Sequence, residues 1–263
     1  MRTARFAAAR PPHSGRGSVL ALAPVRRLED TPIRLQEILK RKTQQTMRSL
    51  LAAILLAITT TSYADSYQLP FSGVWFVVQA GDTPNVNHHM QVTSQWYGID
   101  FAKVSGPSGR SLVSKGGNDL RNFYSWGEAV VSPVSGTIVA IENSLPDNPI
   151  GTHDTKHPLG NHVVIKTNDG DYVFLAHFQK DSVKVSQGDL VHTGDHLGKC
   201  GNSGNSDYPH IHLHTQNTPD FTNGQGKNMI FSNISVELSG KKFERVDWPL
   251  IRGLFVSQNH EKP

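Results

Sequence analysis

The sequence predicts an all-β domain built as an antiparallel sandwich or barrel-like sheet. Its apolar runs are short and alternate with polar residues, which is typical of strands that bury one face. Glycine and proline are plentiful, with 23 and 15 residues in a chain of 263, and they separate these runs as turns do. Helix signals are weak after residue 65. Together these patterns indicate many short strands joined by turns and loops.

The expected strands can be placed along the chain. In order, they lie within residues 65–80, 97–104, 129–141, 161–167, 171–177 and 209–216. Asn168-Asp169-Gly170 stands between two alternating runs, which is the strongest short-range signal of a β-hairpin. Residues 105–127 and 143–160 are rich in turn-forming residues and predict long loops. Loops of this length in a compact domain are more often functional than idle.

The charge of the chain is unevenly distributed. The formal net charge is +4, yet residues 1–46 alone carry +7 and residues 65–263 carry −4. The domain itself is therefore mildly acidic. We predict no basic patch on it and no nucleic-acid partner.

Residues 47–64 have the three parts of a secretory signal peptide. One arginine precedes an apolar run at 50–58, and Ser62-Tyr63-Ala64 forms a small-x-small end. The run is too short to anchor the chain across a bilayer. We expect cleavage after Ala64 and export to the periplasm or the extracellular space, with no integral membrane segment in the mature form.

This signal lies too far from the first residue for a typical leader. We expect translation to begin at Met47, so that residues 1–46 are a basic prefix that is either untranslated or disordered. The alternative is a long basic n-region or a transit-like presequence.

The segment Pro209-His210-Ile211-His212-Leu213-His214 has the most chemical potential. Residues two apart in a strand share a face. The three histidines are therefore expected on one face, with Ile211 and Leu213 packed in the core. Imidazoles at this spacing can bind a metal or transfer protons. The alternative is a solvated strand face that is rich in histidine.

The residues around this segment resemble the lysostaphin/LytM-type zinc metallopeptidases, a family of peptidoglycan endopeptidases. Gly201-Asn-Ser-Gly-Asn-Ser followed by Pro-His-Ile-His resembles the family motifs G-x-T/S-G-x-S and P-H-L-H. Three further segments match in order: Gly98-Ile-Asp100-Phe, Val131-Ser-Pro-Val-Ser-Gly, and Gly160-Asn-His-Val-Val-Ile with Leu175-Ala-His177-Phe. The resemblance spans roughly residues 95–217. It implies a two-layer antiparallel β fold of the duplicated hybrid-motif type, with a groove walled by loops.

The resemblance also implies a zinc ion (Zn2+) and a role for each matched residue. Asp100 and His212 would be ligands, and His210 would be the general base that activates the zinc-bound water. His177 would stabilise the developing oxyanion or orient the water. Three protein ligands leave the fourth tetrahedral position for water, as catalytic zinc requires, and the metal lowers the pKa of that water.

The sequence departs from the family at the first ligand. Trp96 stands where the family has the histidine of H-x-G-x-D, and an indole nitrogen is only a hydrogen-bond donor. Asn87-His88-His89 resembles the N-x-H of a divergent branch that also lacks this histidine. Adjacent strand residues point to opposite faces, so only one of the two histidines should face the groove. We choose His89 as the third ligand. The alternative is that both are loop residues and the site is degenerate or metal-free.

The predicted function is that of an exported zinc metalloendopeptidase acting on peptidoglycan cross-links or another peptide. Trp96 favours a second hypothesis, an inactive LytM-like domain that binds wall fragments or activates a partner hydrolase. Residues 65–217 are assigned to the peptidase-like domain and 218–263 to a C-terminal capping extension. No oligomeric state follows from the sequence.

Overall fold

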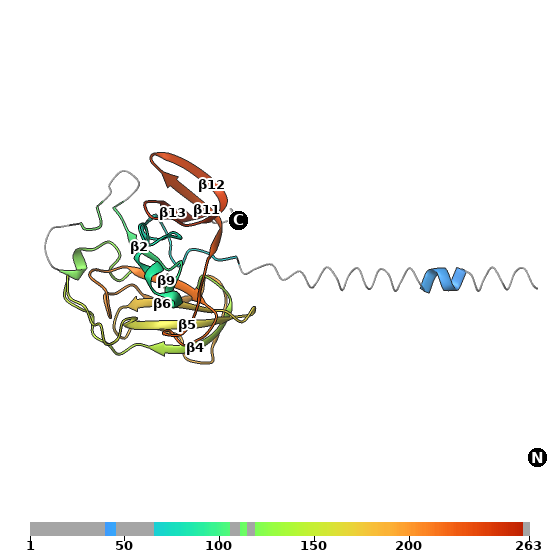
Figure 1. Ribbon diagram of the computed structural model, residues 1–263, viewed down its shortest axis with the longest axis horizontal. Helices are drawn as coiled ribbons and strands as arrows, with labels where there is room; N and C mark the ends of the chain where they lie inside the picture. Colours follow the sequence, from blue (N-terminus) through green and yellow to red (C-terminus); the bar gives the residue numbers. More distant parts are fainter. Residues whose placement is uncertain (1–39, 46–65, 106–110, 115–118, 260–263) are drawn as a thin grey trace, which may run out of the picture. The chain divides into compact units, whose positions relative to one another are not determined.

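The computed structural model describes residues 40–45, 66–105, 111–114 and 119–259 (Figure 1). The chain divides into two compact units, Met1–Thr61 and Ser62–Pro263. Residues 40–45 form a short exposed helical segment in the first unit. The predicted signal peptide at 47–64 lies outside the described residues. Among the residues that are described, no helix is long and apolar enough to cross a membrane.

The second unit is almost entirely β-structure, which confirms the predicted fold class. Its helical turns in the described residues are three short 3-10 segments, η1 (His88–Gln91), η2 (Thr93–Gln95) and η3 (Leu120–Asn122). The strands are β1 (Trp75–Gln79), β2 (Ile99–Lys103), β3 (Ala129–Val131), β4 (Gly136–Glu142), β5 (Asn161–Thr167), β6 (Tyr172–Phe178), β7 (Leu190–Val191), β8 (His196–Lys199), β9 (Ile211–Gln216), β10 (Gly226–Lys227), β11 (Ile230–Leu238), β12 (Lys241–Pro249) and β13 (Phe255–Gln258).

One large antiparallel sheet organises this unit. Its strand order is β12-β11-β13-β1-β2-β9-β6-β5-β4-β7, and β10 pairs with β9. The order is linear, so the sheet is not closed into a barrel. A second, two-stranded sheet joins β3 and β8. The strands after residue 217 continue the large sheet, because β13 pairs with β1 and β11 pairs with β13 (Figure 1).

Strand β9 lies in the middle of the sheet, between β2 and β6, and both of its faces are buried. Ile211 and Leu213 belong to the main hydrophobic core, as the alternation of the sequence predicts. His212 and His214 occupy the opposite face. On that face of the neighbouring strand β6, Phe174 and Ala176 belong to a smaller apolar cluster. The histidines are therefore held in a packed layer rather than on a solvated surface.

The β5–β6 hairpin forms where Asn168-Asp169-Gly170 predicts it. Gly170 has a φ of +90° in the turn, and no atom lies within 4 Å of the place where a Cβ would stand. Gly160, at the start of β5, has a φ of +58°, but there a Cβ would overlap the backbone carbonyl of Ser203. Ser203 also receives the amide of Asn161 on its Oγ at 2.9 Å. Gly160 is thus required for a close contact between two backbone segments.

We predict that Gly160→Ala destabilises the protein much more than Gly170→Ala. Both substitutions place a side chain at positive φ, which costs about 1–2 kcal/mol. Only Gly160→Ala adds steric overlap, which costs roughly a further 1–3 kcal/mol. The free energy of unfolding in urea measures both effects. Equal destabilisation by the two variants would contradict the close contact at Ser203.

Candidate active site

A groove of about 530 Å³ lies over the sheet next to β2 and β9. It contains all five residues that the sequence analysis singled out, His89, Asp100, His177, His210 and His212. The other lining residues include His88, Gln95, His153, Asn205, Asp207 and Tyr208. The groove therefore brings together side chains from segments more than a hundred residues apart.

Asp100 lies at the centre of this cluster. Its Cα is directly opposite that of His212 across the β2–β9 pair. Its Oδ1 lies 3.0 Å from His212 Nδ1 and 3.7 Å from His210 Nε2, and its Oδ2 lies 3.0 Å from His89 Nε2. Burial would raise the pKa of Asp100, but the neighbouring histidines, His89 first, together outweigh it. The net pKa is well below the usual value, so the carboxylate is charged.

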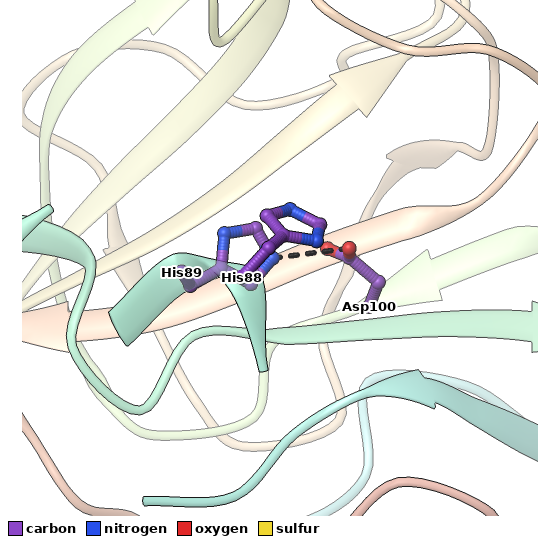
Figure 2. Close-up of side chains that lie close together, drawn as sticks. All are labelled: His88, His89 and Asp100. Atoms are coloured by element: carbon purple, nitrogen blue, oxygen red, sulfur yellow. Dashed lines mark ion pairs between the residues drawn. The ribbon is translucent and has the colours of Figure 1, made fainter. Parts of the chain in front are cut away.

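His88 and His89 lie on a 3-10 segment, not on a strand, and this corrects the expectation that they point to opposite faces. In the tight turn of η1 both rings line the groove. Figure 2 shows both side chains projecting from η1 toward Asp100 on β2, and the three residues offer ligand atoms that all lie within 4.8 Å of one another. His89 is buried, whereas His88 is exposed. The choice of His89 as the inner residue agrees with this burial.

Buried Asn87 holds η1 in place. Its Oδ1 accepts a hydrogen bond from the backbone N–H of His89, which caps the segment. Its Nδ2 donates to the carbonyls of Gly81 and Gly98, each at 3.0 Å. A Cβ on Gly98 would lie 3.1 Å from atoms of the His89 and His212 rings. The glycine therefore lets the two imidazoles approach each other.

Trp96, which replaces the histidine of the family motif, has a structural role here. Its Nε1 donates to the carbonyl of Met90 at 3.1 Å and so ties η1 to the chain that leads into β2. The position that lacks a ligand thus helps to place the segment that carries His89.

The Nε2 of His89 is available for a ligand. Its Nδ1 is paired with Gln95 Oε1 at 3.2 Å, which assigns the ring proton to Nδ1. Nε2 is buried and has no partner in hydrogen-bond geometry, although Asp100 Oδ2 is only 3.0 Å away. Burial lowers the pKa of His89, but Asp100 raises it by more, and the net pKa is raised. The site therefore favours a positive charge on or beside this nitrogen.

His210 and His177 stand on the other side of Asp100, with ring centroids 4.7 Å apart. His210 Nδ1 lies 2.8 Å from the carbonyl of Tyr208, and His177 Nδ1 lies 2.8 Å from the carbonyl of Ser203. Because a carbonyl only accepts, both rings carry a proton on Nδ1. In the neutral rings, both Nε2 atoms are then free to accept a proton.

His177 is held in a strained and neutral state. Its φ of 68° lies in the left-handed region, which is uncommon for a non-glycine residue and clusters at functional sites. Complete burial, followed by the nearby His210 and His212, lowers its pKa well below the ordinary value. A neutral His177 with Nε2 unprotonated can accept a hydrogen bond from water but cannot donate one to an oxyanion. Of its two expected roles, this geometry favours orienting the water.

The donor set fits a zinc ion. Catalytic zinc takes three nitrogen or oxygen ligands from the protein. His89 Nε2, His212 Nδ1 and the Asp100 carboxylate would supply that number, whereas the three ligand atoms found within 4.8 Å of one another are those of His88, His89 and Asp100. A buried carboxylate close to two imidazole nitrogens, one of them without a hydrogen-bond partner, is the arrangement that a cation would complete. These residues therefore suit the metal that the resemblance implies.

Comparison with known proteins finds a family likeness over part of the chain. Residues 114–228 match the model of peptidase family M23. The matched segment is less than half of the 263 residues. The match includes His177, His210 and His212, whereas His89 and Asp100 lie upstream of it in the sequence.

Individual relatives of the chain are distant. An endolysin of Staphylococcus phage 2638A is 34% identical over 100 residues, which cover 36% of this chain and 20% of the endolysin. The matched region thus spans about a fifth of that relative. Among solved structures, the catalytic domain of lysostaphin from Staphylococcus simulans is 19% identical, with a TM-score of 0.34, covering 62% of this chain and 88% of its own. The catalytic domain of a prophage-encoded M23 protein from Enterococcus faecalis is 20% identical, with a TM-score of 0.40 and coverages of 62% and 94%.

The sequence assigns no role to some residues of the site. Asn87 and Gln95 orient His89. Asn87 is the first residue of the N-x-H pattern, which gives it no role, and no motif marks Gln95. Tyr208 lines the groove, and burial raises its pKa to about 12, so its hydroxyl remains a donor at neutral pH. Its place directly before Pro209 was the only available signal.

Proposed function

We propose that this protein is an exported zinc metalloendopeptidase that hydrolyses peptide bonds in peptidoglycan cross-links. The single observation that carries the proposal is the buried Asp100 carboxylate, placed 3.0 Å from nitrogens of both His89 and His212 beside two further imidazoles. The match of residues 114–228 to a peptidase family supports the reaction class. We further propose that residues 47–64 are the export signal and that residues 65–217 form the catalytic region, followed by the extension 218–263.

His89, Asp100 and His212 would hold the zinc ion. A zinc ion held by such ligands lowers the pKa of water and polarises a carbonyl group. His210 would serve as the general base, since its Nδ1–H is fixed by the Tyr208 carbonyl and its Nε2 points toward Asp100 at 3.7 Å. His177 Nε2 would accept a hydrogen bond from the attacking water and orient it.

The protons balance in this scheme. The water oxygen forms a bond to the carbonyl carbon of the scissile peptide while His210 Nε2 takes a proton from the water. The carbon–nitrogen bond then breaks, and His210 returns its proton to the leaving amine. The products are a carboxylic acid, which keeps the second proton of the water, and an amine. At neutral pH that proton passes through the solvent to the amine, which leaves a carboxylate and an ammonium group. Each role needs a neutral imidazole, and the burial of His177 meets that need.

The alternative of a non-catalytic wall-binding relative depends on Trp96. Trp96 donates a hydrogen bond to Met90 and supports η1, and His89 Nε2 lies 3.0 Å from Asp100 Oδ2. These contacts support His89 as the third ligand in place of the histidine that Trp96 replaces. This placement favours the enzyme over the binding module.

We predict that the purified zinc-loaded protein releases new free amino groups from peptidoglycan without releasing new reducing ends. Peptide hydrolysis frees amines, whereas cleavage of the glycan frees reducing sugars. A zinc chelator should abolish the release, and added zinc should restore it. Reducing ends without amines, or unchanged release after removal of zinc, would contradict the proposal.

A further inference from the structure

His212 begins a chain of buried polar side chains that runs away from the groove. On the same face of β9, His212 Nε2 lies 2.8 Å from His214 Nδ1, and His214 Nε2 lies 3.3 Å from Gln216 Oε1. All three residues are buried. His214 and Gln216 do not line the groove, so neither can touch a substrate there. Their polar atoms are nevertheless connected through hydrogen bonds to His212, a predicted ligand.

At the Gln216 end of these hydrogen-bonded side chains, the direction of the hydrogen bonds is fixed. Gln216 Nε2 donates to two backbone carbonyls, those of Thr218 and Asp220, each at 2.7 Å. Carbonyls only accept, so the amide nitrogen must face them and Oε1 must face His214. Because Oε1 is also an acceptor, His214 Nε2 must carry the proton of that ring.

The direction of these hydrogen bonds determines which nitrogen of His212 carries a proton. A neutral His214 with its proton on Nε2 has a lone pair on Nδ1, which can only accept a hydrogen bond. His212 Nε2 must therefore be the donor. In a neutral His212 ring this is the single proton, so Nδ1 faces Asp100 Oδ1 as a bare lone pair at 3.0 Å.

The ring of His214 is also fixed by packing. It stacks on Phe174 with ring centroids 4.6 Å apart and an interplanar angle of 10°, and Phe221 lies 6.0 Å away on another side. This packing holds His214 Nδ1 toward His212. A lone pair and a carboxylate oxygen at 3.0 Å repel each other unless a cation lies between them. The hydrogen bonds of His214 and Gln216 therefore favour the form of His212 with its proton on Nε2, which leaves Nδ1 free to bind a metal.

We propose that His214 and Gln216 are positioning residues that keep the proton of His212 on Nε2 and so present Nδ1 to the metal. The proposal rests on the proposed function in taking zinc as that metal. Residues that hydrogen-bond a ligating histidine typically contribute about 10–100-fold to metal affinity. The hydrogen-bonded series His212–His214–Gln216 is called the β9 relay below. In the sequence, His214 and Gln216 are visible only as two residues that continue the alternation of polar and apolar positions after His212.

The test measures zinc affinity by competition with a chelator, using the full chain. His214→Phe keeps an aromatic ring against Phe174 but removes the acceptor, and we expect zinc to bind about 10–100-fold more weakly. His214→Asn places an amide oxygen near the position of Nδ1 and should recover most of that loss. Phe174→Leu weakens the stacking while leaving the acceptor, and its affinity should fall by less than that of His214→Phe. Gln216→Leu offers a second way to break the relay if His214→Phe does not fold.

A nitrogen NMR spectrum of the metal-free protein at neutral pH locates the proton on His212 directly. We expect it on Nε2 in the wild type and redistributed in His214→Phe. A proton on Nδ1 in the wild type, or unchanged zinc affinity in a folded His214→Phe protein, would overturn the proposal. A wild-type protein that binds no zinc would instead contradict the proposed function. The NMR spectrum would then still show which nitrogen of His212 carries the proton.

Discussion

His210→Ala is expected to abolish peptide hydrolysis while leaving zinc bound. Its Nε2 is the acceptor that the proposed reaction uses for the proton of the attacking water, and no predicted zinc ligand is removed. Loss of a general base typically slows a reaction about 10²–10⁴-fold. Release of free amino groups from peptidoglycan measures the rate, and metal analysis of the same sample measures the zinc.

A surface histidine provides the matched control for His210→Ala. His192 lies outside the groove and contacts Asp195 on an exposed turn. His192→Ala changes the same residue type and should leave the rate unchanged. If His210→Ala retained the wild-type rate, His210 would lose the role of base. If it lost its zinc as well, His210 would have to be reassigned as a ligand.

His89→Ala is expected to weaken zinc binding by more than the roughly 100-fold that loss of an outer hydrogen bond causes. The variant removes one of three proposed ligands and leaves Asp100 and His212 to hold the ion. His89 Nε2 is buried without a partner in hydrogen-bond geometry and lies 3.0 Å from Asp100 Oδ2, so its loss removes a proposed ligand atom beside the carboxylate. Competition with a chelator gives the affinity.

The neighbouring residue supplies the control for this prediction. His88 lies on the same 3-10 segment and also has a ligand atom within 4.8 Å of the cluster, but it is exposed (Figure 2). His88→Ala should bind zinc within a few-fold of the wild type. The reverse result, with zinc lost in His88→Ala and kept in His89→Ala, would exchange the two assignments.

The regular parts of the fold follow from local patterns. The alternation of Ile211 and Leu213 with histidines predicts a strand with one face in the core, and β9 has that form. Asn168-Asp169-Gly170 predicts the β5–β6 hairpin, because glycine reaches the positive φ that the turn needs. These features depend on residues close together in the sequence.

The composition of the cluster could be predicted only in part. Asp100 and His212 face each other because β2 pairs with β9, and no local pattern contains that pairing of residues 112 positions apart. The resemblance to a family supplied it instead. The choice of His89 over His88 assumes that both lie on a strand. In the structure, capping by Asn87 produces a 3-10 turn with different geometry.

The β9 relay formed by His212, His214 and Gln216 could not be predicted from the sequence. Its direction is set by the carbonyls of Thr218 and Asp220, which reach Gln216 through the conformation of the loop that follows the strand. A sequence pattern reports which side chains share a face, but it does not report which of two ring nitrogens carries a proton. That property depends on three-dimensional contacts.

The zinc content of the purified wild-type chain, measured beside His89→Ala and His88→Ala, tests the central claim most directly. The proposed site predicts one zinc ion per chain in the wild type, one in His88→Ala and none in His89→Ala after equilibration with a chelator of intermediate strength. A folded wild-type chain without zinc, or one zinc ion in all three proteins, would contradict a site built from His89, Asp100 and His212.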